Sequence, residues 1–162
     1  MQTTYRILNR AIEGLLVLIF SLLVLDVVWQ VVSRYVVGQS SSFTEEFARF
    51  SLIWLTVLGA AYINGQKEGH LSMDFLLARL PLDKQKRRQR IIQIFMAVFA
   101  LIIMVIGGGN LVYTTLKLGQ LSPALLVPLG YVYAIVPICG LIIIFFSIYH
   151  FKITFNANNN EH

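Results

Sequence analysis

The stretch AIEGLLVLIFSLLVLDVVWQVVS, residues 11–33, decides the fold class of this chain. Its ionisable side chains are Glu13 and Asp26, and the remainder is almost wholly apolar. A helix of about 20 residues, rising 1.5 Å per residue, crosses the roughly 30 Å hydrocarbon layer of a bilayer. Because lipid offers no hydrogen-bond partners, the backbone must bond within the segment. The stretch therefore predicts a transmembrane helix, and it is too long for the apolar part of a cleaved signal peptide.

Three further apolar stretches have a comparable length, at residues 47–64, 91–113 and 130–151. The composition agrees, since 57% of the chain is hydrophobic and 13% is charged, whereas a soluble domain usually carries about 25% charged residues. We therefore predict an all-α integral membrane protein with four transmembrane helices. These form a single membrane domain over residues 1–155, followed by a disordered tail at 156–162.

The distribution of lysine and arginine predicts the orientation. Cytoplasmic loops of membrane proteins carry an excess of these residues. Three of the thirteen, Arg34, Arg49 and Lys117, fall on one predicted side of the membrane. The other ten fall on the opposite side: Arg6, Arg10, Lys67, Arg79, Lys84, Lys86, Arg87, Arg88, Arg90 and Lys152. We expect that side, with both termini, to be cytoplasmic. The cluster from Lys84 to Arg90 is expected to meet anionic lipid headgroups.

The connections between the spans carry local signals. In the long connection, the apolar residues at 71, 75, 76 and 80 share one stripe that Pro81 ends, which predicts a short interfacial amphipathic helix. The pair Ser122-Pro123 favours the start of a short helix in the last connection. Ser42 and Glu45 fit the capping box that opens a helix, and Glu45 and Arg49 are spaced to pair on one helix face.

Polar residues within the spans are candidates for function. An aspartate at mid-bilayer costs about 3 kcal/mol on insertion scales, so Asp26 should face a partner. Asp26, Gln30 and Ser33 share one helix face, which is expected to be buried. Asp26 could pair with Arg49, either within the chain or across to another subunit. A proton or ion relay is conceivable on this face, but a structural polar contact is favoured.

Small residues in two spans predict close helix packing. They are Gly59, Ala60 and Ala61 in the second span, and Gly107, Gly108 and Gly109 in the third. Three glycines could also mark an unwound, ion-binding break. Transporters usually place such breaks at matching points of two repeats, and the first half of this chain has no counterpart. Packing is therefore favoured.

The chain carries no pattern typical of an enzyme. It has no Ser/His/Asp set, no phosphate-binding glycine loop and no metal triad. Cys139 is the single cysteine. His70 and Asp74 are spaced to share a metal ion, but a hydrogen bond at a helix start is favoured for them. We expect no cofactor, no metal and no nucleic-acid partner.

An ordered set of motifs resembles a known family. The set is SFTEEFAR at 42–49, Trp54, GAA at 59–61 and GHLSMD at 69–74. It is similar to the small membrane subunit of TRAP transporters, the tripartite ATP-independent periplasmic systems. Glu45, Glu46, Arg49, Trp54, His70 and Asp74 are the positions that match the family. The resemblance implies that they form subunit contacts or stabilise the fold, and that they do not bind substrate.

The resemblance also implies a role in transport across the bacterial inner membrane. In this family a periplasmic binding protein delivers an organic acid to two membrane subunits. The large subunit carries the sodium and substrate sites, and the small subunit is an obligatory scaffold that anchors it. Because the chain ends just after the fourth span, it resembles the unfused form, which pairs with a separate large subunit as a heterodimer. The implied substrate is sialic acid or a C4-dicarboxylate, with a lean towards sialic acid.

Two other functions remain as alternatives. The first is a self-sufficient four-helix, proton-coupled transporter that uses Asp26. Transporters of that kind that work as antiparallel dimers need a weak charge bias, and ten basic residues against three fix one orientation. The second is an assembly or lipid-organising protein with no transport partner. The resemblance favours the transporter subunit over both.

Overall fold

The computed structural model describes residues 2–36, 38, 41–66 and 82–159. In these residues all the regular elements are helical: α1 (Gln2–Val36), α2 (Ser42–Gly65), α4 (Leu82–Phe99), the π-helix η1 (Ala100–Gly107), α5 (Gly108–Lys117), α6 (Leu129–Tyr133) and α7 (Ile135–Asn159). Four stretches are long and apolar enough to cross a membrane: Thr3–Val36, Ser42–Gly65, Ile91–Lys117 and Leu129–Phe151. The prediction of an all-α fold with four such spans is confirmed.

Some local expectations lie outside the described residues, and others meet a different outcome. The predicted amphipathic helix lies in residues 67–81, outside the described residues, as do His70 and Asp74. The disordered tail was expected from residue 156, yet α7 continues to Asn159, because extending a formed helix costs far less than starting one. Ser41 rather than Ser42 precedes the first turn of α2, and it makes no side-chain cap. The capping-box prediction is therefore wrong.

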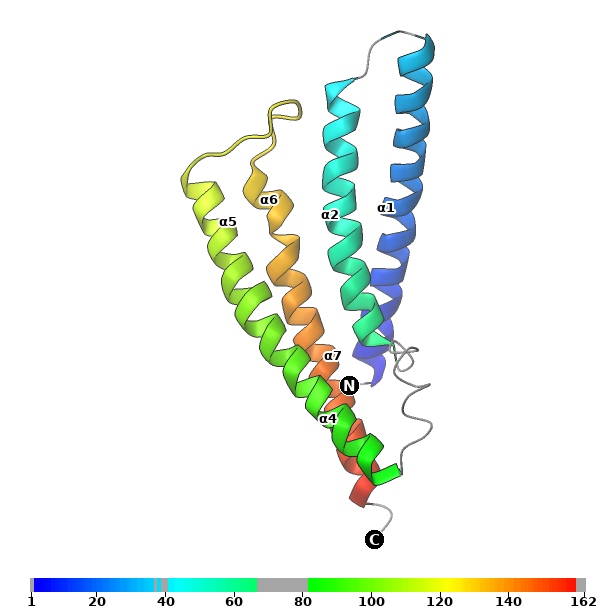
Figure 1. The fold of residues 1–162 in the computed structure, drawn as a ribbon, viewed down its shortest axis with the longest axis vertical. Coiled ribbons are helices and arrows are strands. Elements are labelled where there is room, and N and C mark those ends of the chain that lie inside the picture. Colours follow the sequence, from blue (N-terminus) through cyan, green and yellow to red (C-terminus); the bar gives the residue numbers. More distant parts are fainter. Residues whose placement is uncertain (1, 37, 39–40, 67–81, 160–162) are drawn as a thin grey trace.

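The helices are arranged as an open row rather than a closed bundle. α1 packs chiefly against α2, α2 packs against α7, and α7 packs against α4 and η1. The N-terminal end of α1 and the C-terminal end of α7 lie at the same end of the molecule, here called the terminal end (Figure 1). From there the α1/α2 pair and the α5/α6 pair diverge toward the opposite end, here called the loop end (Figure 1).

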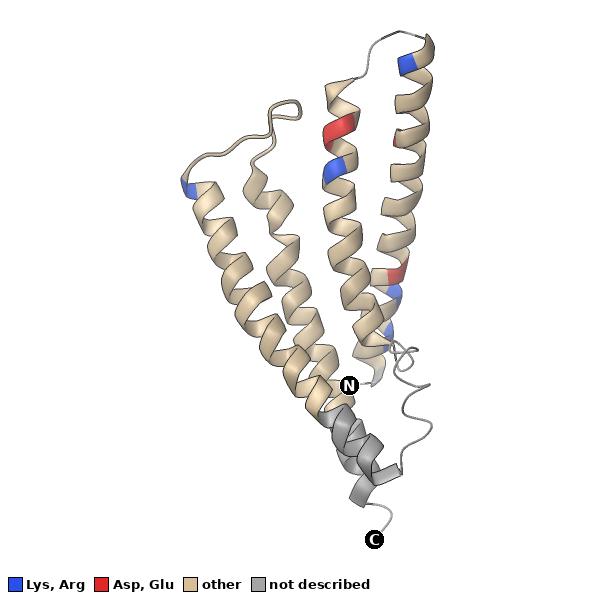
Figure 2. Cartoon of the chain, in the orientation of Figure 1, with Lys and Arg blue, Asp and Glu red and all other residues tan. Residues whose placement is uncertain are grey.

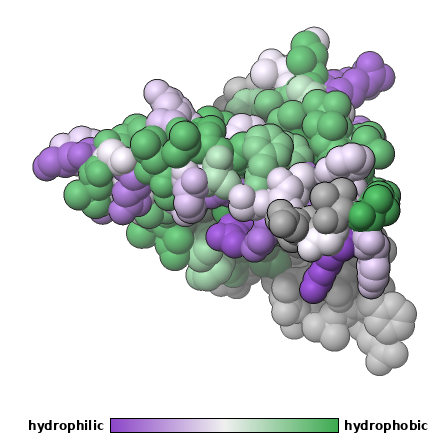
Figure 3. Space-filling view, turned by 90° about the horizontal axis from the view of Figure 1, so that it is seen from above, coloured by the Kyte–Doolittle hydropathy of each residue, from purple (hydrophilic) through white to green (hydrophobic). Residues whose placement is uncertain are grey.

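Charge and hydropathy follow this arrangement. Charged residues of the described ribbon gather toward the ends of the helices, with long uncharged stretches between them (Figure 2). Hydrophobic side chains cover much of the surface seen from the loop end (Figure 3). Large apolar side chains on α1 are well exposed, with Leu25 at 66% and Trp29 at 60%. Such exposure at the edge of the row suits a surface that meets lipid or another protein rather than water.

An aromatic cluster holds the helices together at the terminal end. Tyr5 of α1 stacks on Tyr149 of α7, with ring centroids 4.6 Å apart, and meets the edge of Phe146. The Tyr5 hydroxyl donates to the carbonyl of Gly65, at the end of α2. A Cβ at Gly65 would lie 2.7 Å from the Phe146 ring, so only glycine lets α2 approach α7 this closely. Three of the four spans thus meet at one point.

The last two spans are irregular where they touch each other. Pro137 has no N–H to give to the carbonyl of Tyr133, and the helix is interrupted at Ala134, between α6 and α7. On the facing span, η1 is π-helical from Ala100 to Gly107. Gly140 of α7 packs so closely on η1 that an added Cβ would lie 2.8 Å from Met104 Cβ. The glycines at 107–109 are themselves helical, so this span has no unwound break.

Candidate functional site

Glu46 ties the second span to the loop that precedes α6. It lies in the second turn of α2, and its side chain is buried, with 7% of the residue exposed. Its Oε2 atom accepts hydrogen bonds from the backbone N–H groups of Ala124 and Leu125, both at 2.8 Å. A carboxylate that accepts two amides forms charge-assisted bonds, which are stronger than neutral ones. Glu46 therefore fixes the spacing between α2 and this loop.

The loop itself is a tight turn, and the helix expected from Ser122-Pro123 is absent from it. Ser122 N–H donates to Val127 O at 2.9 Å, and Leu126 N–H donates to Ser122 O at 3.0 Å. Leu126 adopts a positive φ of 54°, a conformation that costs a residue with a Cβ about 1 kcal/mol. The chain leaves the helical region at Leu126, so the start signal at Ser122-Pro123 is followed by a single turn and no helix.

Two further polar side chains of α2 reach the backbone of the fourth span. Trp54 Nε1 donates to Val132 O in α6 at 3.0 Å, close to the interruption at Ala134. Asn64 Nδ2 donates to Ile143 O in α7 at 3.3 Å and also lies 3.4 Å from Ser147 Oγ. With Glu46, these residues form three links spread along the length of α2. We call Glu46, Trp54 and Asn64 the α2 links.

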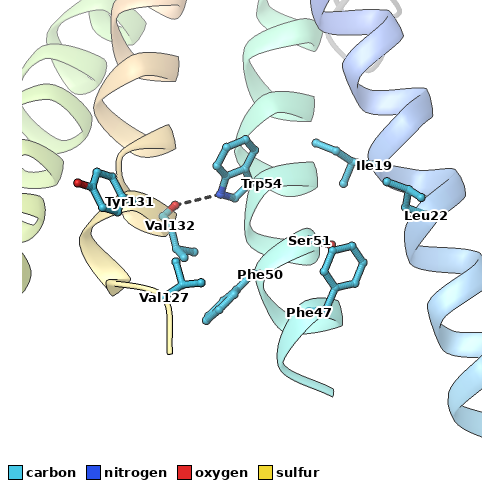
Figure 4. Close-up of a pocket in the computed structure, with 9 residues that line it drawn as sticks. All are labelled: Ile19, Leu22, Phe47, Phe50, Ser51, Trp54, Val127, Tyr131 and Val132. Carbon is cyan, nitrogen blue, oxygen red and sulfur yellow. Dashed lines mark hydrogen bonds between the residues drawn. The ribbon is translucent and has the colours of Figure 1, made fainter. Parts of the chain in front are cut away.

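An apolar groove of about 310 Å³ opens between α1 and α6, with α2 at its back. Figure 4 shows the lining side chains on α1, on α2 and around α6, and the Trp54–Val132 hydrogen bond that crosses from α2 to α6. The lining residues are Ile19 and Leu22 of α1, Phe47, Phe50, Ser51 and Trp54 of α2, and Val127, Tyr131 and Val132 around α6. We call this the α1–α6 groove. Apolar lining of this kind suits an apolar occupant.

Asp26 lies on α1 one turn beyond Leu22, on the same face of the helix. It is half-buried, and its Oδ2 accepts a hydrogen bond from Gln30 Nε2 at 3.2 Å. Ser33, on the same face, is buried and donates to Gln30 O. The face predicted to be buried is thus buried at Ser33 and only half-buried at Asp26 and Gln30.

Arg49 does not pair with Asp26 in this chain. Its nearest carboxylate is Glu45 on the same helix, at 3.5 Å, and both side chains are about two-thirds exposed, at 67% and 66%. The pairing of Glu45 with Arg49 one turn apart follows the i, i+4 rule. An exposed pair of this kind contributes at most about 1 kcal/mol in water. The intrachain Asp26–Arg49 pair is therefore absent, because a closer acid lies on the same helix.

Of the residues predicted to pack helices closely, Gly108 does so within this chain, whereas Gly59, Ala60 and Gly107 have no close neighbour on another of the described helices. Gly108 packs inside the chain, where an added Cβ would lie 3.0 Å from Val136 Cγ1 and 3.1 Å from Pro137 Cδ. Gly59 has no atom within 4 Å of such a Cβ, and Ala60 is exposed. Gly107 has Ile102 O at 3.7 Å as its neighbour.

The expected headgroup residues Lys84, Lys86, Arg87, Arg88 and Arg90 belong to α4, and their side chains lie outside the described part of the chain.

Sequence reasoning placed Glu46 and Trp54 among the important residues but missed their contacts. The backbone groups that they bind lie 78 or 79 residues away, and no spacing rule links segments so far apart. The α1–α6 groove was also missed, since its apolar lining looks like any other part of a span. In the described residues, no three His, Cys, Asp or Glu side chains converge as a metal site would require.

Four helices that are long and apolar enough to cross a membrane indicate a multi-pass membrane protein. The family described as "Tripartite ATP-independent periplasmic transporters, DctQ component" matches residues 22–155, and the chain belongs to this family. A relative from Haemophilus influenzae, named as a candidate TRAP transporter small permease protein, is 29% identical over 143 residues. That match covers 88% of this chain and 86% of the relative. The chain is thus a transporter component and not an enzyme.

Proposed function

We propose that this chain is the small permease subunit that pairs with a separate large membrane subunit and holds it in the membrane as a scaffold. The supporting observation is how α2 uses its polar side chains. Glu46, Trp54 and Asn64 each bond to the backbone of another segment of the same chain. Polar groups used in this way stabilise an arrangement of helices, whereas a transport path needs polar groups that remain available to a solute.

The partner would carry the transport chemistry. In this proposal the large subunit binds sodium and substrate, the sodium gradient drives uptake, and a periplasmic binding protein delivers an organic acid. Sialic acid or a C4-dicarboxylate is the proposed substrate. The terminal end of the molecule lies in the cytoplasm and the loop end in the periplasm, as the ten-to-three distribution of basic residues favours. The membrane is the bacterial inner membrane.

Reconstitution into liposomes tests this function. The small subunit, the large subunit and the binding protein are combined in all pairings and together, with an inward sodium gradient and labelled sialic acid or C4-dicarboxylate. Uptake is expected only when all three proteins and the gradient are present. Solute movement by the small subunit alone, abolished by Asp26→Asn, would contradict the scaffold role and favour the proton-coupled alternative.

A further inference from the structure

The α1–α6 groove and the carboxylate beside it form one surface. We propose that this surface receives a transmembrane helix of the large membrane subunit, and that this helix presents a lysine or arginine side chain to Asp26. The inference rests on the proposed function, because it requires such a partner. It goes further in assigning the face of the chain that binds the partner and the chemistry of the partner's contact.

The shape of the row selects this face. α2 has two sides that are not covered in the same way. Phe47, Ser51 and Trp54 line the groove. Leu52, Thr56 and Ile63 project from the opposite side of the helix at 100° per residue, and all three are exposed. On the groove side, side chains of α1 and α6 flank α2. A helix seated there would contact three elements at once, and van der Waals packing is the main attraction between helices in lipid.

The charge of Asp26 selects the occupant. A phospholipid acyl chain would also fit an apolar groove at membrane depth, so shape alone does not decide. An ionised carboxylate can accept about four hydrogen bonds, and the Gln30 amide supplies one of them. An acyl chain offers no donor, and it would leave a half-buried carboxylate facing hydrocarbon, which is unfavourable. A helix with a basic side chain at the depth of Asp26 supplies both the apolar contact and the opposite charge.

Photo-crosslinking in membranes tests the assigned face. A benzophenone amino acid is placed singly at two groove positions, Leu22 and Tyr131, and at two positions on the opposite side of α2, Leu52 and Ile63. The native side chains are comparably exposed, at 44% and 65% in the groove and 51% and 53% on the opposite side. Crosslinks to the co-expressed large subunit are expected from the groove positions, at least about tenfold above the opposite side.

The outcomes separate the two proposals. Stronger crosslinks from Leu52 and Ile63, or adducts with phospholipid from Leu22 and Tyr131, would overturn the assignment while the complex itself still co-purifies. If the large subunit does not co-purify with the unmodified chain, the proposed function itself fails.

The charge of Asp26 is tested separately. Asp26→Leu is expected to lower the amount of large subunit retained on affinity purification by about tenfold, and Glu13→Gln, an exposed acid toward the other end of the same helix, should leave it unchanged. Retention of the partner at the normal level by Asp26→Leu would contradict the proposed charge pair. The crosslinking experiment keeps Asp26 intact, so the face remains testable even if Asp26→Leu folds poorly.

Discussion

Glu46 and Leu125 lie 79 residues apart in the sequence, and a 2.8 Å hydrogen bond joins the carboxylate of the first to the backbone amide of the second. The same carboxylate oxygen accepts a second bond of equal length from the backbone amide of Ala124. The loop before α6 is therefore positioned by a side chain of α2. Several consequences of this geometry can be measured.

Glu46→Ala should lower the thermal unfolding midpoint of the purified chain in detergent by about 4 °C or more. The substitution leaves two part-buried amides without their acceptor, and donors that lose their partner away from water are costly. Glu45→Ala is the matched control, since Glu45 is the neighbouring acid with an exposed side chain, and it should move the midpoint little. Equal midpoints for the two variants would contradict the role given to Glu46.

Trp54→Phe should destabilise the chain by about 1 kcal/mol, because it keeps a large ring in the groove but removes the donor to Val132 O. The chain has two tryptophans, and Trp29 is 60% exposed on α1. Trp29→Phe should therefore leave stability within about 0.5 kcal/mol of the parent. Chemical unfolding followed by helical circular dichroism gives both values. A loss for Trp29→Phe as large as that for Trp54→Phe would refute the link.

Gly140→Ala should cost about 1–3 kcal/mol through overpacking, because the new methyl group would lie 2.8 Å from Met104 and 3.3 Å from the Val105 backbone nitrogen. Gly59→Ala meets open space in this chain. It should be neutral or stabilise the isolated chain by about 0.5–1 kcal/mol, since alanine is the better helix former. The order of the two unfolding free energies checks this prediction, and a reversed order would contradict the close contact between η1 and α7.

Single-cysteine labelling should report the orientation of the chain. The native Cys139 is fully buried, so the parent chain should resist a membrane-impermeant maleimide on intact cells after outer-membrane permeabilisation. Gln120→Cys, at the exposed loop end, should react from the periplasmic side, and Thr3→Cys should react only after the inner membrane is opened. Labelling in the opposite pattern would overturn the orientation proposed from the basic residues.

The number and place of the spans were predictable because the thickness of hydrocarbon dictates the length of an apolar helix. The apolar composition of residues 11–33 and 130–151 was enough to predict spans there. The first span was predicted over residues 11–33, but α1 runs from Gln2 to Val36. The helix is longer than the span because it continues where the chain turns polar. The interruption between α6 and α7 also has a visible cause in Pro137.

Other features had no counterpart in the sequence. The π-helix from Ala100 to Gly107 is uniformly apolar, and no residue type in it marks a change of helical geometry. The contact between Glu46 and the loop depends on how α2 meets a segment far along the chain. The absence of the expected Asp26–Arg49 pair within the chain depends on distances between helices, whereas the Glu45–Arg49 pair was predicted from its spacing. Tertiary packing decides each of these, and single-sequence patterns do not encode it.

The three α2 links share a property that bears on how this chain tolerates change. Each of them donates to or accepts from a main-chain atom: the amides of residues 124 and 125, the carbonyl of residue 132 and the carbonyl of residue 143. Every residue type except proline offers both groups. Substitutions in the loop and the last span can therefore keep these bonds, whereas substitutions at Glu46, Trp54 and Asn64 of α2 lose them. Substitution should be permitted on one side of each contact and resisted on the other.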